Sequence, residues 1–122
     1  MNSYDILRQV RGDTFAGISF ELNTQASPSD PLVPISLVGA TVKMQVRIEP
    51  DSATNLIEWI SSNAAQITIT GIDNNKINIL AKRIPANAPA KKCVYDVQIT
   101  FADGTIKTYI GGIFEILKDV TR

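Results

Sequence analysis

The sequence predicts an all-β fold, a single antiparallel β-sandwich of about seven or eight strands with an immunoglobulin-like architecture. Three observations carry this prediction. Short runs of alternating apolar and polar residues recur along the chain, turn-forming residues separate them, and no window of about ten or more residues keeps a helical period. No repeat, linker or low-complexity tract divides the 122 residues, so we expect one domain over residues 1–122.

The first predicted strands flank a turn at Arg11-Gly12-Asp13. Residues 4–10 form the strand before this turn, and residues 14–22 form the strand after it. Within the second strand, residues 18–22 alternate strictly between apolar and polar side chains. We therefore expect the apolar set of that segment to face the core.

Residues 42–48 show the clearest alternation in the chain. A period of two is required when one face of a strand packs on a core, because successive side chains point to opposite faces. Pro50 is expected to close this strand, because proline cannot donate to a sheet ladder. The side chains predicted to point inward are Val42, Met44, Val46 and Ile48.

A hairpin is predicted from residues 66–70 and 76–80. The five residues between these runs, 71–75, are rich in types that tolerate positive φ. Residues 55–60, which include Trp59, are predicted to form a further strand, although their alternation is less regular. The hairpin side chains expected in the core are Ile67, Ile69, Ile77 and Ile79.

The strongest hairpin signal is Asp103-Gly104, which lies between the runs 94–102 and 105–110. This dipeptide suits a two-residue type I′ turn. Counting outward from such a turn gives a register with one mostly apolar face and one mostly polar face. The predicted pairs are Phe101 with Ile106, Thr100 with Lys107, Ile99 with Thr108, Gln98 with Tyr109, Val97 with Ile110, Asp96 with Gly111 and Tyr95 with Gly112.

Three segments interrupt the regular pattern. Gly111-Gly112 lies inside the last strand, where paired glycines predict a bulge or a close backbone approach. Residues 24–34 hold three prolines and are the most loop-like part of the chain, suited to face solvent or a partner. Residues 84–92 carry two more prolines, and we expect a short helical turn there.

Composition limits the classes of partner. Lys plus Arg and Asp plus Glu both count 12, and the basic residues are scattered, so we expect no nucleic-acid partner. The sequence shows no membrane span and no secretion signal, so no membrane partner is expected either. Near-zero net charge favours self-association and hence a homo-oligomer. The single cysteine, Cys93, is interpreted as a small core residue in a reducing compartment.

The chain lacks the residues of common catalytic sites. It has no histidine and one cysteine, so no zinc site and no histidine-based acid or base can form. No nucleophile elbow, Ser-x-x-Lys run or phosphate-binding glycine loop is present. We therefore predict no enzyme, no catalytic residues, no cofactor and no metal site. An enzyme built on a pair of carboxylates stays a remote alternative.

Other residue patterns have ordinary structural explanations. Asp73-Asn74-Asn75 is interpreted as a turn rather than a calcium loop, because the acid spacing of an EF-hand is missing. Arg11-Gly12-Asp13 matches the integrin tripeptide but is interpreted as the turn already described. Trp59, Tyr95 and Tyr109 could stack on sugars, yet aromatic residues in a small sandwich more often pack in the core or at its rim.

A family resemblance follows from the order of four segments. These are residues 11–15, residues 37–47, residues 95–99, and the stretch from Asp103-Gly104 to the end of the chain. In this order they resemble small structural proteins of tailed bacteriophages and prophages, and the chain is similar to the immunoglobulin-like N-terminal domain of phage baseplate upper proteins. The resemblance spans nearly the whole chain, although this chain stops after one domain, and the family has no catalytic residues to transfer.

The resemblance implies a non-enzymatic structural or assembly module, associated with the tail or baseplate, that acts through protein–protein contacts. Other virion or tail proteins are the expected partners. The expected location is the virion, after synthesis in the bacterial host cytoplasm. Residues 118–122 could extend into a neighbouring subunit, although a frayed terminus is the simpler interpretation. The alternative function is a carbohydrate-binding β-sandwich that uses exposed aromatic residues.

Overall fold

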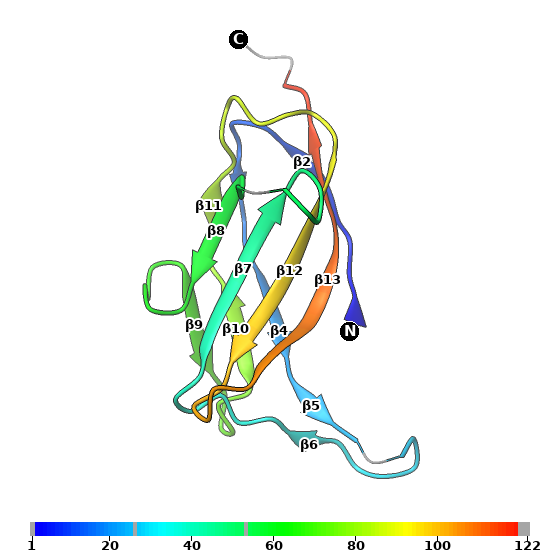
Figure 1. Ribbon diagram of the computed structural model, residues 1–122, viewed down its shortest axis with the longest axis vertical. Coiled ribbons are helices and arrows are strands. Elements are labelled where there is room, and N and C mark those ends of the chain that lie inside the picture. The colour runs from blue at the N-terminus through cyan, green and yellow to red at the C-terminus, as the bar shows by residue number, and fades with distance from the viewer. Residues whose placement is uncertain (1, 26, 53, 120–122) are drawn as a thin grey trace.

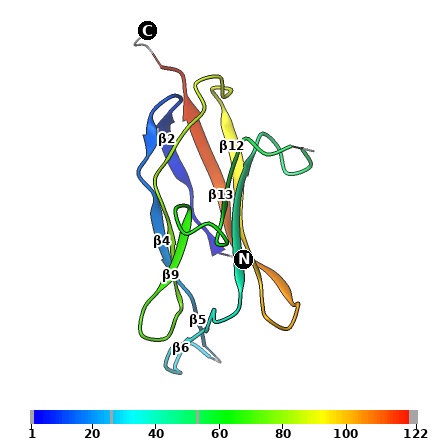
Figure 2. The ribbon, with the colours of Figure 1, turned by 90° about the vertical axis from the view of Figure 1, so that its left-hand side faces the viewer.

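The computed structural model describes residues 2–25, 27–52 and 54–119, and this part of the chain is an all-β sandwich without helices (Figure 1). Figure 2 shows its two layers from the side. The first sheet has the strand order β1 (Asn2–Ser3), β13 (Ile106–Leu117), β12 (Lys92–Thr100), β7 (Thr41–Arg47) and β8 (Ile57–Ile60), and β2 (Ile6–Val10) also pairs with β13. The second sheet has the order β4 (Ile18–Glu21), β10 (Lys76–Ile79) and β9 (Ile67–Thr70).

Two short ladders complete the strand pairing. One joins β3 (Thr14–Phe15) to β11 (Lys82–Arg83), and the other joins β5 (Asn23–Thr24) to β6 (Val33–Pro34). Five of the thirteen strand segments in the described residues are two residues long, and the other eight have four residues or more. The predicted all-β sandwich is confirmed, and the eight longer strands agree with the expected number. The immunoglobulin-like architecture stays a prediction.

The core lies between the two sheets and is formed by the predicted alternation. Val42, Met44 and Val46 of β7 are fully buried, but Ile48 is exposed because β7 ends at Arg47. The prediction that Ile48 points inward is therefore wrong. Trp59 of β8 is also fully buried, and its indole Nε1 donates to the Leu80 carbonyl at 3.0 Å.

The predicted hairpin between residues 66–70 and 76–80 is confirmed. β9 and β10 pair antiparallel, with Ile77 opposite Ile69 and Ile79 opposite Ile67. Ile69 is half-buried, whereas the other three are buried. The helical turn expected in residues 84–92 is absent. A single turn stands there instead, closed by a bond from Ala88 N to Pro85 O at 3.1 Å, because the prolines of this segment remove backbone donors.

The β12–β13 hairpin agrees with the predicted register only in its body. Tyr95, Asp96 and Val97 pair as predicted, but an irregularity between Val97 and Gln98 places Gln98 opposite Thr108. The pairs nearer the turn are thus shifted by one residue. Tyr109 is the extra residue on β13, as expected of a β-bulge.

The turn itself explains this shift. Gly104 N donates to Phe101 O at 2.9 Å and Phe101 N donates to Thr105 O at 2.8 Å, so the loop has three residues, not two. Gly104 has a φ of 91°, but Asp103 does not have the positive φ that a type I′ turn requires. The Asp103 carboxylate instead accepts from Thr105 N at 2.9 Å. A type I turn followed by a left-handed glycine replaces the predicted turn.

The bulge therefore lies before Gly111-Gly112 and not at these residues. The expected close approach is present at Gly112, where a Cβ atom would lie 2.5 Å from the Tyr4 carbonyl oxygen. The chain crosses here from β1 to β2, and Tyr4 N donates to Gly111 O at 3.0 Å. Only glycine at position 112 leaves room for this crossing.

Candidate docking surface at the loop end

Three connections meet at one end of the sandwich, which we call the loop end (Figures 1 and 2). They are residues 27–40, which include the tip of the protruding β5–β6 hairpin, the β9–β10 loop 71–75, and the β12–β13 loop 101–105. The sheet order brings these segments together from distant parts of the sequence. Connections of this kind, positioned by a rigid sandwich, are common sites of protein recognition.

Specific contacts hold the three connections against one another. Leu37 N donates to Asn74 O at 2.9 Å, which joins the first connection to the second. A Cβ atom on Gly39 would lie 3.1 Å from the Ala102 side chain, so the first and third connections are also in close contact. Both contacts lie within the connections themselves, and the loop end is therefore a single surface rather than three separate loops.

Asn75 stabilises the base of this surface through hydrogen bonds. It is a buried polar residue, and its Nδ2 donates to the Leu22 carbonyl at 3.0 Å and to Asn23 Oδ1 at 3.3 Å. Leu22 N in turn donates to Asn75 O at 2.9 Å. A buried amide with its donors bonded stabilises the local geometry. The Leu22 carbonyl also accepts from Ile35 N at 3.1 Å, so two donors meet at this oxygen. Asn75 thus fixes where the β5–β6 hairpin leaves the sandwich.

Five large apolar side chains of the loop end point into solvent, and we include among them Ile106, the first residue of β13, because it directly follows the third connection. The exposed fractions are 101% for Ile72, 69% for Val38, 62% for Leu32, 59% for Ile106 and 52% for Val33. Single exposed apolar residues are ordinary, but a group of five at one end of a small domain is typical of an interaction surface. Full burial of one such side chain is worth about 1.5–3 kcal/mol.

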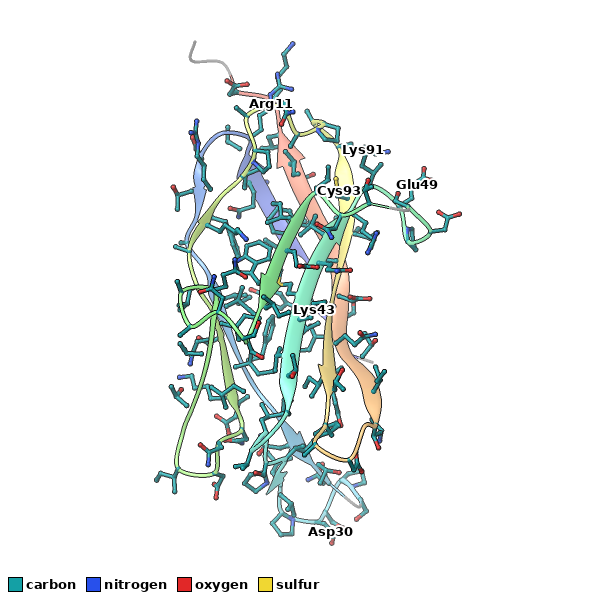
Figure 3. The ribbon with its side chains drawn as sticks, turned by 60° about the vertical axis from the view of Figure 1, so that its left-hand side comes forward. Arg11, Asp30, Lys43, Glu49, Lys91 and Cys93 are labelled. Atoms are coloured by element: carbon teal, nitrogen blue, oxygen red, sulfur yellow. The ribbon has the colours of Figure 1, made fainter. Side chains whose placement is uncertain are left out.

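Acidic side chains accompany these apolar groups. Asp30, Asp73 and Asp103 lie one on each connection and are exposed, and Figure 3 shows Asp30 at the far tip. Hydrogen bonds from the backbone and the side chain of Thr105 lower the pKa of the Asp103 carboxyl. The carboxylate form is therefore favoured, and the loop end combines apolar contacts with negative charge. This combination suits a protein partner with apolar and basic residues.

A hollow of about 300 Å³ opens on the outer face of the six-stranded sheet, beside Arg47 and Asp96. The Arg47 guanidinium donates to Ser52 O and to Gln45 Oε1, both at 2.7 Å, so it anchors the loop after β7. Burial raises the pKa of the Asp96 carboxyl, and the nearby Arg47 charge opposes that rise. We assign this cluster a structural role.

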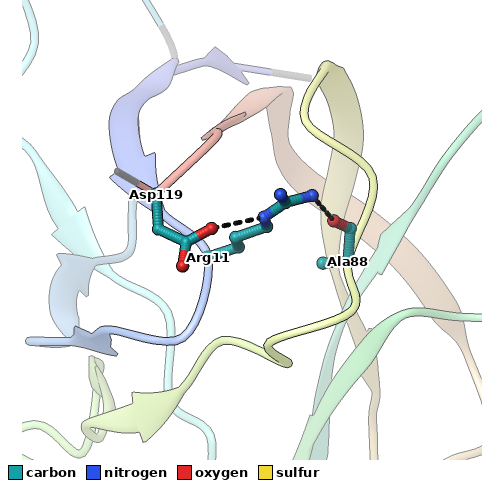
Figure 4. Close-up of polar contacts among 3 residues, drawn as sticks. All are labelled: Arg11, Ala88 and Asp119. Carbon is teal, nitrogen blue, oxygen red and sulfur yellow. Dashed lines mark hydrogen bonds and ion pairs between the residues drawn. The ribbon is translucent and has the colours of Figure 1, made fainter. Parts of the chain in front are cut away.

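The Arg11-Gly12-Asp13 turn is confirmed, and it lies at the opposite end from the loop end. The Arg11 guanidinium pairs with Asp119 at 2.8 Å and donates to Ala88 O at 3.5 Å (Figure 4). Gly12 N donates to Ile84 O at 2.9 Å. An arginine held within its own domain in this way is not presented to a receptor.

The possible extension of the C-terminal tail, residues 118–122, into a neighbouring subunit stays a prediction. Residues 120–122 of this tail lie outside the described residues.

The turn interpretation of Asp73-Asn74-Asn75 is also confirmed. Asn74 has a φ of 51°, a conformation that asparagine tolerates, while the Asn75 side chain points inward to the Leu22 carbonyl.

Within the described ranges, no three His, Cys, Asp or Glu residues are grouped as metal ligands. Cys93 is buried as predicted, and burial raises the pKa of its thiol, although the Lys91 charge opposes this rise.

The three aromatic residues proposed for sugar stacking do not form an exposed platform. Trp59 and Tyr95 are buried in the core. The Tyr95 hydroxyl donates to the Tyr4 carbonyl, and burial, with the nearby Asp5 and Tyr4, raises its pKa to about 12. Tyr109 is half-buried and packs edge-on against Phe101, with ring centroids 6.3 Å apart. Core and rim packing therefore accounts for all three.

Sequence reasoning missed the apolar members of the loop end. A weak signal was present at Val38 and Ile72, because each is an apolar residue beside a glycine in a connection and so has no strand face to occupy. Leu32 and Val33 lie within a proline-rich loop, where apolar side chains have no expected place in a core. Their common location, however, depends on the sheet order.

These observations define the class of the chain as an all-β sandwich domain with an apolar, acidic loop end. No protein-family model and no curated protein matches the sequence. Among the described residues, none forms a helix long and apolar enough to cross a membrane.

Proposed function

We propose that this chain is a non-enzymatic structural module of a tailed phage or prophage virion, associated with the tail or baseplate, that acts through protein–protein contacts. The five exposed apolar side chains of the loop end carry this proposal, because such a group gains stability when a partner covers it. The order of motifs that resembles phage structural proteins supports the same function. The other virion or tail proteins are the proposed partners, and the virion is the proposed location.

The direct test uses the strain that encodes the chain. Prophage induction or phage infection, followed by density banding of particles and immunoblotting, should show the chain in the virion band, and immunogold labelling should place it on the tail. Particles that contain all other tail proteins but lack this chain would refute the proposal. A tagged copy that retains the loop end serves as the positive control for detection.

The loop end also accounts for the proposed homo-oligomer, and light scattering coupled to size-exclusion chromatography tests it. We expect a defined oligomer whose dissociation constant rises by more than about tenfold in the variant Val38→Ser with Ile72→Ser, because each change removes apolar contact area. Leu117→Ser, a comparable change at the far end of β13, is the matched control and should leave the oligomer unchanged. A wild-type monomer at all concentrations would exclude self-assembly and leave docking to another virion protein.

No observation favours the carbohydrate-binding alternative. Sugar recognition by stacking needs exposed aromatic faces, and Trp59 and Tyr95 are buried.

A further inference from the structure

The free edge of β4 presents unpaired backbone groups at the side of the sandwich. β4 is an end strand of its sheet and pairs only with β10. Leu22 N donates to Asn75 O at 2.9 Å in the same register, so Phe20 and Ile18 also direct their backbone groups toward β10. Ser19 and Glu21 therefore direct theirs away from the sheet. An edge of this kind can pair with another strand.

Two other sheet edges in the described residues are protected, those of β8 and β2, while β9 is the other end strand of the sheet that contains β4. On β8, the Glu58 carbonyl accepts from Lys82 Nζ, and Ile60 N donates to Gln66 Oε1 at 3.0 Å. On β2, Arg8 adopts a left-handed φ of 58°, and the register with β13 is irregular there. Side-chain caps and bulges are devices that prevent edge pairing. β4 has neither device on its outward groups.

A groove runs along this open edge. It lies between Ser3 and Tyr4 on one wall and residues 18–22 on the other, is also lined by Ile110, and has a volume of about 430 Å³. We call it the side groove. A second hollow of about 320 Å³ shares Tyr4 and Ile18 with it and extends the space along β2. Edge and groove together form an elongated site, in which backbone hydrogen bonds lie beside apolar side chains.

Charge indicates what kind of segment fits. Asp5 and Glu21 are the acids along the two hollows, and no lysine or arginine lines either of them. A strand added to β4 would place alternate side chains toward the groove and the others beside Ser19 and Glu21 on the outer face. Glu21 already faces Lys76 of β10 in the strand register, and a lysine or arginine opposite Glu21 on the added strand would give the carboxylate a second cross-strand pair, on the open side of β4.

We infer that the side groove binds an extended segment of a partner protein, which adds as a strand to β4. The segment has apolar side chains at alternate positions and a lysine or arginine opposite Glu21. This inference is independent of the loop end and of the virion assignment, because it depends only on the edge, the groove and their charge.

A labelled synthetic peptide tests the inference. The probe has ten residues, alternating valine and threonine with lysine in place of one central threonine, and binding is followed by fluorescence anisotropy up to about 1 mM. A second peptide carries glutamate in place of lysine. A third has the same sequence with N-methyl groups on alternate residues, which removes the donors of one edge.

Ser19→Pro is the central protein variant, because it removes the outward N–H of β4 at a position that tolerates proline. Ser19→Ala is its matched control, since it removes the same hydroxyl contact to Asn78 at 2.8 Å but keeps the N–H. Circular dichroism of each variant shows that the domain is folded. Glu21→Lys tests the charge, and Asp73→Lys makes the same reversal outside the groove.

We expect the lysine peptide to bind, and both Ser19→Pro and N-methylation to weaken binding by about tenfold or more relative to their controls. Glu21→Lys should transfer the preference to the glutamate peptide, while Asp73→Lys should leave it unchanged. Hydrogen exchange at the Ser19 and Glu21 amides should slow when the peptide is bound. No binding by the lysine peptide, or equal binding by Ser19→Pro and Ser19→Ala, would overturn the inference.

Discussion

Gly112→Ala should destabilise the domain through a backbone collision and not through a change in backbone conformation. The added Cβ would lie 2.5 Å from the Tyr4 carbonyl oxygen, 2.8 Å from Asp5 Oδ1 and 3.0 Å from the Tyr4 carbonyl carbon. The Tyr4 segment must therefore move. Its carbonyl accepts from the buried Tyr95 hydroxyl, and Asp5 Oδ1 accepts from Ile113 N at 3.0 Å, so both bonds are disturbed.

The magnitude follows from these contacts. Overpacking costs about 1–3 kcal/mol, and leaving the buried Tyr95 hydroxyl without a partner costs about 1–3 kcal/mol. Partial relaxation of the segment reduces the total to about 2–4 kcal/mol, a large share of the about 5–15 kcal/mol that stabilises a typical domain. For a domain of this size the melting temperature should fall by roughly 3–5 °C per kcal/mol.

Urea unfolding of four proteins checks this reasoning. They are the wild type, Gly112→Ala, Tyr95→Phe and the double variant. Gly112→Ala should cost about 1–2 kcal/mol less in the Tyr95→Phe background, because no hydroxyl is left unpaired there. Gly104→Ala is the control for conformational strain, since Gly104 has a φ of 91° with no atom near its Cβ position, and we expect a cost of about 1–2 kcal/mol. A change below about 0.5 kcal/mol for Gly112→Ala would refute the collision.

Three further predictions follow from individual groups. Cys93 should react with a thiol reagent much more slowly in the native protein than in urea, because it is buried and its thiol pKa is raised; equal rates would contradict its core position. Asn75→Ala should lower the free energy of unfolding by about 0.5–1.5 kcal/mol in urea titrations, because the Leu22 carbonyl loses one donor and keeps the bond from Ile35 N; an unchanged value would exclude a role for Asn75 in holding the loop end in place. The pKa of the Asp103 carboxyl is lowered in the folded state, so the carboxylate stabilises the fold above the unfolded pKa of about 3.9, and this stabilisation is lost as the pH falls through the folded pKa. The difference in unfolding free energy between the wild type and Asp103→Ala should therefore become smaller in acid. A difference that is constant with pH would rule out this charge effect.

The β12–β13 hairpin shows which part of a strand register can be predicted from local alternation of apolar and polar residues. Its alternation predicted the pairs from Tyr95 to Val97 correctly, because the period of two determines which face of a strand is apolar. The same pattern failed nearer the turn. Asp-Gly is compatible with both a two-residue and a three-residue loop, and the choice depends on whether Asp103 adopts a positive φ. That choice, together with the bulge, displaced every pair beyond Val97.

The loop end and the side groove were beyond sequence reasoning for a different reason. Val38, Ile72 and Ile106 are far apart in the sequence, and each by itself is an ordinary apolar residue in or beside a turn. They meet because β7, β10 and β13 all begin at the same end of the sandwich. The open edge of β4 likewise exists only because β1 and β2 pair with β13 in the other sheet.

Local periodicity and composition were enough to predict the all-β class and the core faces of most strands, and the sequence directly shows the absence of histidine and of a second cysteine. The strand pairing determines which connections lie at the same end, which strand edges are capped by side chains and where a glycine is needed for the chain to cross. These features arise from long-range strand pairing. A local sequence pattern does not show which strand pairs with a given edge or which residues cover an exposed side chain.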